Sequence, residues 1–385
     1  MTARDDRTRV LFVIQGVELG GLEMVVRRIA EGLPREGYHC GIACFDTLGE
    51  MQPALEANGI EVFLEPRRPG LDWRYPFRLA RRIREWRADV VHTHNATALF
   101  YGTLAARLAK VPAIYTEHDR QFPGRARTAV MNRWLARANH RIVTVSETLR
   151  ESLIRHERFD PAHVEVIVNG VPDVGAPDPV DVARVRRELG LSESSVVIGT
   201  IGRLDPIKSH AELIRSFRVI AERDDRRTLV IIGSGPEAEA LRAVREECGL
   251  ERSVLLPGER REIAPYLAAF DLFVLPSKSE GMPVALIEAM AASKASVSMD
   301  VGGVGEVVRD GVEGRVTPPA DWRAFEEAVE LVLGDAATRE AMGRRARQRF
   351  EAELTLSAMV EAYRSVYDSA VGEKAAVPAL ARETV

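Results

Sequence analysis

The chain alternates short apolar runs with helical segments, and the whole alternation occurs twice. Runs suited to buried strands lie in the first half at 10–14, 38–45, 60–64, 89–92, 112–116 and 141–145. A second series lies at 196–201, 228–232, 253–256, 270–275 and 295–299, followed by helical periodicity from about 322 to 370. This alternation predicts parallel sheets with helices on both faces. A chain of 385 residues also exceeds what one hydrophobic core normally supports, so we expect two α/β domains.

The predicted domain boundary lies at a segment rich in Pro and Gly, 171–179, which is typical of a linker. We therefore expect an N-terminal domain at 1–172 and a second domain that begins at 173 and ends at 355. The tail at 372–385 is expected to be disordered. Residues 1–170 carry 25 Lys and Arg against 21 Asp and Glu, whereas the rest carries 28 against 36. The N-terminal half is thus the one expected to meet an anionic partner or a membrane surface.

Composition favours a cytoplasmic location. No apolar run is long enough to span a membrane, and the charged start of the chain does not resemble a signal peptide. The three cysteines lack metal-binding spacing, which predicts free thiols in a reducing compartment.

The most informative segment is Pro276–Ala292, which follows an apolar run and contains Glu280 and Glu288. Gly281 marks a turn, and Pro283 is well placed at a first helical position. Such a helix directs free backbone N–H groups and the positive end of its dipole at the mouth of the sheet, where they favour a phosphate. Glu280 in the turn could bind a sugar hydroxyl, and Glu288 inside the helix could bind a ribose. Solvated acids at a helix end are the alternative.

Other motifs occur in a fixed order around this segment. They are Gly20-Gly21-Leu-Glu23, Asp89-Val-Val-His-Thr-His94, Thr116-Glu-His-Asp119, Val145-Ser-Glu147, Asn169-Gly170-Val171, Gly202-Arg-Leu-Asp-Pro-Ile-Lys208, Ile232-Gly-Ser-Gly-Pro-Glu237 and Val301-Gly-Gly303. In this order and spacing, the chain resembles the retaining glycosyltransferases of family 4. That resemblance implies the GT-B fold, in which two Rossmann-like domains face each other across a cleft. It also implies that a helix at 356–371 returns to the N-terminal domain.

The resemblance places the nucleotide sugar on the second domain and the acceptor mainly on the first. Arg203 and Lys208 are the candidates for binding the diphosphate, where fixed cations stabilise the departing group. A surface salt bridge is the alternative for this pair. Backbone groups are expected to meet the donor at the following positions: Gly20, Gly21, Gly258, Met282, Val284 and Ala285. Gly258 would face the base, and Pro283 removes one N–H that relatives often offer to the sugar.

Histidines near strand ends complete the candidate site. The resemblance assigns His118 a catalytic role beside the donor sugar, together with Glu280, Arg203 and Lys208. His94 and Arg120 are candidates for the acceptor. Structural roles are the alternative for a histidine near a strand end. No Asp-x-Asp pair of the kind that holds a metal–nucleotide complex follows a strand, so we expect metal-independent transfer without a cofactor.

The sequence thus predicts transfer of a hexosyl or N-acetylhexosaminyl group from a nucleotide diphosphate sugar to a polysaccharide or lipid-linked acceptor. A nucleotide-sugar 2-epimerase and a non-catalytic sugar-nucleotide binding module remain alternatives. A nicotinamide site at Gly233–Ala238 is disfavoured because no acidic residue ends the next strand. A glycosidase is disfavoured because it would not need a diphosphate site.

A predicted basic helix at 74–87 is the candidate for contact with the acceptor partner. Its arginines lie close in sequence to Trp73, Phe77, Ile83 and Trp86. Arginines beside interfacial aromatics suit an anionic membrane or a lipid-linked diphosphate. A solvated helix whose apolar side packs on the sheet is the alternative. No feature indicates a nucleic-acid partner.

Overall fold

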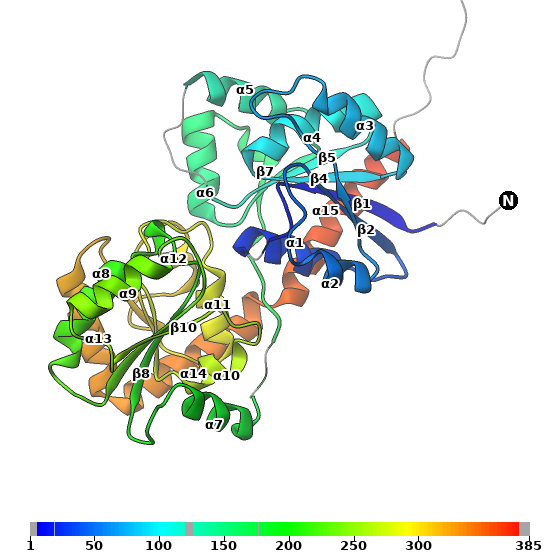
Figure 1. Ribbon diagram of the computed structural model, residues 1–385. Helices are drawn as coiled ribbons and strands as arrows, with labels where there is room; N and C mark the ends of the chain where they lie inside the picture. The colour runs from blue at the N-terminus through cyan, green and yellow to red at the C-terminus, as the bar shows by residue number, and fades with distance from the viewer. Residues whose placement is uncertain (1–5, 19, 120–125, 174, 176, 377–385) are drawn as a thin grey trace, which may run out of the picture. The chain divides into compact units, whose positions relative to one another are not determined.

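The computed structural model describes residues 6–18, 20–119, 126–173, 175 and 177–376. The chain forms two compact units (Figure 1). Unit 1 comprises Met1–Gly170 and Leu356–Val385, and unit 2 comprises Val171–Thr355. The first boundary therefore lies two residues before the one expected at 172. Helix α15, Leu356–Ala376, continues past 371, so the expectation of disorder from 372 is wrong as far as Ala376.

Unit 1 contains a seven-stranded parallel sheet in the order β3-β2-β1-β4-β5-β6-β7. Its strands are β1 Thr8–Ile14, β2 Tyr38–Cys44, β3 Glu61–Leu64, β4 Val90–His94, β5 Ala113–Glu117, β6 Arg141–Thr144 and β7 Val164–Val166. The first six correspond to predicted strands. The seventh was not predicted, because three residues are too few to show an apolar pattern.

Helices cover both faces of this sheet (Figure 1). They are α1 Gly21–Gly32, α2 Gln52–Ala57, α3 Tyr75–Glu85, α4 Asn95–Ala109, α5 Ala126–Ala136 and α6 Glu147–Ser152, with a π-helical turn at Leu153–Glu157 and a 3-10 turn at Pro161–His163. The helices α3 and α4 pack together on one face, and α5 lies beside α4. The helices α1 and α15 pack together on the other face, and α15 contacts β4.

Alternation along the strands decides which side chains meet each helical layer. Leu11 and Val13 of β1 pack into the core that α3 and α4 share. Phe12 points to the opposite face, where its ring lies 5.5 Å from that of His92. His92 bonds in turn to Tyr367 of α15. The returning helix is therefore part of the core of unit 1.

Unit 2 contains a six-stranded parallel sheet in the order β10-β9-β8-β11-β12-β13. Its strands are β8 Val196–Ile201, β9 Arg227–Ile232, β10 Val254–Gly258, β11 Leu272–Leu275, β12 Ser296–Met299 and β13 Gly314–Thr317. Its helices are α7 Pro179–Glu188, α8 His210–Ala221, α9 Ala238–Glu247, α10 Ala264–Ala269, α11 Val284–Ala291, α12 Val304–Val307, α13 Trp322–Gly334 and α14 Ala336–Glu353, with a 3-10 turn at Pro206–Lys208. The short strand β13 was not predicted.

Both sheets reverse the direction in which strands are added at one point, between β1 and β4 in unit 1 and between β8 and β11 in unit 2. A crevice opens at the carboxyl ends of parallel strands at such a switch point, and ligands of this fold class bind there. Within the described residues, no helix is long and apolar enough to cross a membrane.

Candidate active site

The switch point of unit 2 brings together the two turns that the sequence singled out. Lys208 lies in the turn after β8, and Glu280 lies in the turn after β11. A backbone hydrogen bond from Lys278 N to Ile207 O, 2.8 Å long, joins the two turns. Each side chain is thereby fixed by a strand end and by the neighbouring turn.

Lys208 and Glu280 form an ion pair, with Nζ 2.6 Å from Oε1. The hydroxyl of Ser277 donates to the same oxygen at 2.6 Å. The pair is partly buried, with side-chain exposures of 24% for Lys208 and 9% for Glu280. Both of these hydrogen bonds from described residues use Oε1, so Oε2 can accept a hydroxyl from a ligand.

Glycines allow a third turn to pack against this pair. Gly302 has φ +54°, and a Cβ built there would lie 1.6 Å from the carbonyl oxygen of Glu280. The next residue, Gly303, donates its N–H to the carbonyl of Gly281 at 3.1 Å. The Val301-Gly-Gly303 motif therefore shapes the backbone of the Glu280 turn. Only glycine accommodates this approach without displacing that turn.

Arg203 occupies a different environment from Lys208. Its side chain is 67% exposed, and its guanidinium lies 3.3 Å from Asp205. Asp205 in turn accepts the N–H of Ile207 and caps the short 3-10 turn. The structure thus places Arg203 next to the Lys208 turn but pairs it with another carboxylate.

The remaining predicted donor residues lie on turns and a helix end of unit 2. Gly258 ends β10 with φ +82°. Met282 is buried, and Val284 and Ala285 are the first two residues of α11, whose N–H groups have no intrahelical acceptor. Pro283 is the N-cap of α11 and not its first helical residue, so the predicted position of this proline is wrong by one residue. Glu288 is 9% exposed inside α11.

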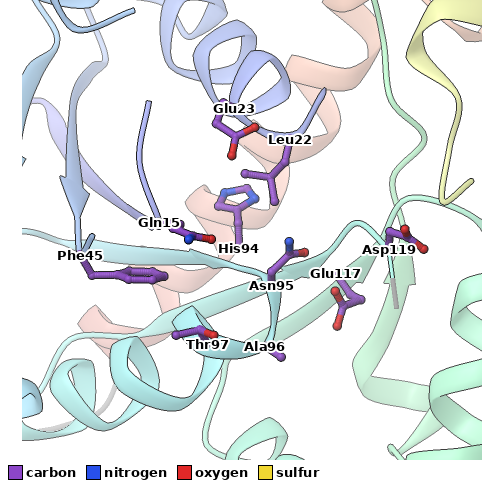
Figure 2. Close-up of a pocket in the computed structure, with 10 residues that line it drawn as sticks. All are labelled: Gln15, Leu22, Glu23, Phe45, His94, Asn95, Ala96, Thr97, Glu117 and Asp119. Carbon is purple, nitrogen blue, oxygen red and sulfur yellow. The ribbon is translucent and has the colours of Figure 1, made fainter. Parts of the chain in front are cut away.

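A pocket of about 280 Å³ occupies the switch point of unit 1 (Figure 2). Its walls come from the end of β1, the start of α1, the end of β2, the β4–α4 junction and the end of β5. The lining residues are Gln15, Leu22, Glu23, Phe45, His94, Asn95, Ala96, Thr97, Glu117 and Asp119. Asn95 has φ +68°, an uncommon conformation for a residue other than glycine.

Three buried histidines gather at this edge of the sheet, and one of them, His94, lines the pocket. They meet because alternate residues of β4 and the end of β5 point to one face of the sheet. His94 Nδ1 lies 2.8 Å from His118 Nε2, and the rings of His92 and His94 are 4.1 Å apart. His92 bonds to Tyr367 at 2.8 Å and to Thr116 at 2.7 Å. Hydrogen bonds and one ring contact, between His92 and His94, therefore connect α15 to the pocket.

Burial keeps these histidines uncharged at neutral pH. It lowers the pKa of His118 to about 3 and holds the pKa values of His92 and His94 well below the ordinary value for histidine. His94 lines the pocket and is 2% exposed. Its Nε2 has no hydrogen-bond partner among the described residues. His94, which the sequence assigned to the acceptor, is thus the histidine among the described lining residues of this pocket, whereas His118 hydrogen-bonds to His94.

Gly20 and Gly21 lie at the start of α1. Gly20 is the N-cap of α1, and a Cβ built there would lie 2.2 Å from the carboxylate of Glu23. That carboxylate lies in front of the helix start at which Gly20 and Gly21 were expected to meet a phosphate. Arg120 lies outside the described residues.

Sequence reasoning did not single out Glu23, Glu117 or Gln15 as site residues, although all three line the pocket. Their shared signal is their place at the carboxyl ends of strands or the start of the following helix. Among the described residues, no group of three His, Cys, Asp or Glu could hold a metal ion.

Two Rossmann-like sheets with a site at each switch point are the architecture of the GT-B fold. A solved structure of Anabaena HepE with UDP is similar over 94% of this chain and 100% of the HepE chain, with a TM-score of 0.84 at 23% identity. The model for glycosyl transferases group 1 matches residues 181–349, and that for glycosyltransferase family 4 matches residues 19–173. The chain belongs to glycosyltransferase family 4.

Two relatives are similar to the chain over most of its length. A D-inositol 3-phosphate glycosyltransferase of Kribbella flavida is 30% identical over 74% of this chain and 73% of the relative. The UDP-Gal:alpha-D-GlcNAc-diphosphoundecaprenol alpha-1,3-galactosyltransferase of Escherichia coli is 28% identical over 82% of this chain and 86% of the relative. The protein is therefore an enzyme that transfers a glycosyl group from a nucleotide sugar.

Proposed function

We propose that the enzyme transfers a hexosyl or N-acetylhexosaminyl group, with retention of anomeric configuration and without a metal ion, to a polysaccharide or lipid-linked acceptor. Unit 2 would hold the donor, and unit 1 would hold the acceptor. The observation that carries this proposal is the Lys208–Glu280 pair at the switch point of unit 2. It combines a cation for the diphosphate with a carboxylate for the sugar.

Lys208 would act mainly on the leaving group. Its ammonium has three donors, one of which is bonded to Glu280, so others remain for phosphate oxygens. Negative charge grows on the β-phosphate oxygen as the bond to the anomeric carbon breaks. A fixed cation therefore binds the transition state more tightly than the ground state. Arg203 and the N-terminus of α11 would add to this field, which is the basis for proposing metal independence.

Glu280 would orient the donor sugar. Lys208 and Ser277 hold its Oε1, so Oε2 can accept a sugar hydroxyl. No covalent attack is assigned to it. The acceptor oxygen would bond to the anomeric carbon on the face that the diphosphate leaves, and the acceptor proton would pass to the departing phosphate.

We propose that the product is part of a bacterial-type surface polysaccharide or glycolipid. The name of the E. coli relative gives a sugar linked to a diphosphate lipid as its acceptor. A cytoplasmic enzyme that acts on such a lipid would work at the inner face of a membrane. We therefore propose that unit 1 contacts an anionic membrane surface.

The proposed membrane-binding surface of unit 1 extends beyond α3, the basic helix that the sequence predicted. Several α3 arginines are paired: Arg78 with Asp72 at 3.0 Å, Arg81 with Glu85 at 2.7 Å and Arg82 with Glu65 at 2.5 Å. Their charge is thus partly neutralised within the protein.

Exposed aromatics gather instead along the outer side of α4. Trp73 is 65% exposed and contacts the ring of Phe100, while Trp134 is 56% exposed and lies beneath Arg107. Phe100 and Arg107 are seven positions apart and so share one helix face. The segments of α4 and α5 contain no Asp or Glu, so the charge around these aromatics suits anionic lipid.

The proposed reaction is tested by screening nucleotide sugars for thermal stabilisation and then measuring nucleoside diphosphate release with and without acceptors. Transfer requires release that depends on an acceptor. Conversion of free donor without an acceptor would indicate an epimerase, and binding without any release would indicate a binding module. Persistence of activity in excess EDTA tests the proposed metal independence. Loss of activity on chelation, restored by Mg²⁺ or Mn²⁺, would overturn it.

A further inference from the structure

The imidazole of His94 has one engaged and one unengaged nitrogen among the described residues. Nδ1 lies 2.8 Å from Nε2 of His118. Nε2 is buried and has no hydrogen-bond partner there, although the side chain lines the pocket of unit 1 (Figure 2). Buried polar atoms in proteins are nearly always hydrogen-bonded. An unpartnered nitrogen at a pocket therefore indicates a group that a ligand satisfies.

Neighbouring rings and one backbone contact hold this imidazole in place. The ring centroid of His94 lies 6.0 Å from that of Phe12, 4.1 Å from that of His92 and 5.1 Å from that of His118. The backbone N–H of His118 also donates a long hydrogen bond, 3.4 Å, to the side-chain oxygen of Asn95. His118 thus contacts the β4–α4 junction through both its ring and its backbone. We therefore expect the His94 ring to need little ordering when a ligand binds.

The hydrogen bond between the two imidazoles decides which of their nitrogens are protonated, since a neutral ring has one N–H. If His118 donated, the proton of His94 would lie on Nε2 and form a buried N–H without a partner. If His94 donates through Nδ1, its Nε2 is bare and the other N–H lies on Nδ1 of His118. That atom is not among the buried unpartnered atoms of the described residues. Buried N–H groups without a partner are rarer than unpartnered acceptors, which favours the second arrangement.

We propose that Nε2 of His94 accepts a hydrogen bond from the acceptor hydroxyl, and that His118 is a positioning residue that fixes the His94 tautomer. The inference rests on the proposed function in one respect, the assignment of the acceptor to unit 1. It gives His118 a role different from the contact with the donor sugar that the family resemblance implies.

His94 would orient the hydroxyl without taking its proton, because burial holds the pKa of His94 well below the ordinary value for histidine. The acceptor oxygen would bond to the anomeric carbon as the bond from that carbon to the phosphate oxygen breaks. The hydroxyl proton would pass to the departing phosphate, as in the proposed reaction. His94 would therefore be neutral before and after transfer.

NMR of the full-length protein, with its histidines labelled with nitrogen-15, tests the tautomer. A long-range proton–nitrogen spectrum at pH 7.5 distinguishes protonated from bare ring nitrogens, and His94→Asn identifies the His94 signals by their loss. We expect Nδ1 of His94 to be protonated and Nε2 to be bare. Addition of N-acetylglucosamine or inositol as hydroxyl probes should shift the Nε2 signal. The signals of His156, which is exposed, should stay unchanged.

Substitutions separate the roles of the two histidines in binding of the same probes. His94→Asn keeps a polar group near the position of Nδ1 but has none at Nε2, so binding should weaken by about tenfold. His118→Gln can still accept the His94 Nδ1–H, whereas His118→Leu cannot. We expect binding within about twofold of wild type for His118→Gln and about fivefold weaker for His118→Leu. In His118→Leu, the spectrum should also show that His94 no longer has a single tautomer. His156→Asn is the control and should bind as wild type does.

Three outcomes would overturn the inference: a protonated Nε2 on His94 in the wild type, no shift of this nitrogen with either probe, or equal probe binding by His118→Gln and His118→Leu. Thermal stabilisation by nucleotide sugars, measured on the same samples, reports on donor binding separately. A protein that binds a nucleotide sugar but gives one of these outcomes contradicts only the roles of the two histidines. A protein that binds no nucleotide sugar contradicts the proposed function itself.

Discussion

The two switch points of this enzyme differ in how they use charge. In unit 2, Lys208 and Glu280 are ionised side chains on turns, partly exposed and paired with each other. In unit 1, His94 and His118 are neutral side chains at strand ends, buried and linked by one hydrogen bond. A charged, partly open site suits a diphosphate, whereas a neutral buried nitrogen among carboxylates suits a hydroxyl. The same sheet topology thus supports ionised side chains at one switch point and neutral imidazoles at the other.

The largest effect should come from removing the cation of unit 2. Lys208→Ala should lower turnover by about 10²-fold or more, comparable to the loss of one preorganised stabiliser of transition-state charge. Folding should survive because the side chain is partly exposed. The measurement is nucleoside diphosphate release at saturating donor and acceptor.

Two other cations serve as comparisons in that assay. Arg203→Ala should have a smaller effect than Lys208→Ala, because Arg203 is more exposed and pairs with Asp205. Lys278→Ala should be nearly neutral, since Lys278 pairs with Glu212 and its side chain is 56% exposed. Near-normal turnover of Lys208→Ala would remove the diphosphate assignment.

The two glutamates of unit 2 should separate by function. Glu280→Gln should lower rate and sugar discrimination, since it removes the charge that orients the sugar. Glu288→Gln should mainly weaken nucleotide binding, by about 1.5–3 kcal/mol if it loses a hydrogen bond that involves a charged group. Calorimetry with the nucleoside diphosphate alone distinguishes them. Equal weakening by both substitutions would show that the roles are misassigned.

The buried histidines of unit 1 predict how stability depends on pH. Their folded-state pKa values lie below the unfolded value of about 6.5, so the unfolded chain binds more protons in between. The contribution of their neutral forms to the free energy of unfolding is therefore complete above about pH 6.5. This contribution is lost as the pH falls toward their folded-state pKa values. Each histidine should lower the free energy of unfolding by about 1.4 kcal/mol for every pH unit between its unfolded and folded pKa values.

Denaturant unfolding at pH 7.5 and 5.5 measures this loss. His118→Asn should reduce the difference between the two pH values, because it removes one titrating group. His156→Asn is the control, since His156 is exposed. An unchanged pH dependence in His118→Asn would contradict the assignment of a neutral buried imidazole.

The sequence was more informative about unit 2 than about unit 1 for a physical reason. Lys208 and Glu280 lie on turns whose local residues determine their geometry, so motifs alone indicate where these two side chains lie, and the structure pairs them at the switch point of unit 2. The roles of His94 and His118 depend on strand register and on α15, which packs on β4 from far along the chain. No local pattern reports which of two nearby histidines faces a pocket. Likewise, β7 and β13 are too short for periodicity and form only by pairing with β6 and β12.

The smallest expected effect concerns the outer surface of unit 1. Arg107→Gln should weaken binding to anionic vesicles by about 1 kcal/mol, the contribution of one cation near such a surface. Arg218→Gln is a matched control on unit 2, where the exposed arginine pairs with Glu222 in the next helical turn. Co-sedimentation with neutral and anionic vesicles at low and high salt measures the difference, because salt screens surface attraction. Trp73→Ser with Trp134→Ser should weaken vesicle binding further and leave nucleotide affinity unchanged, since the proposed nucleotide site lies in unit 2. Leu331→Ser, an exposed apolar residue of α13, controls for lost surface area. A wild-type protein that ignores lipid charge, or dimerises through these tryptophans, would show that this face does not bind a membrane.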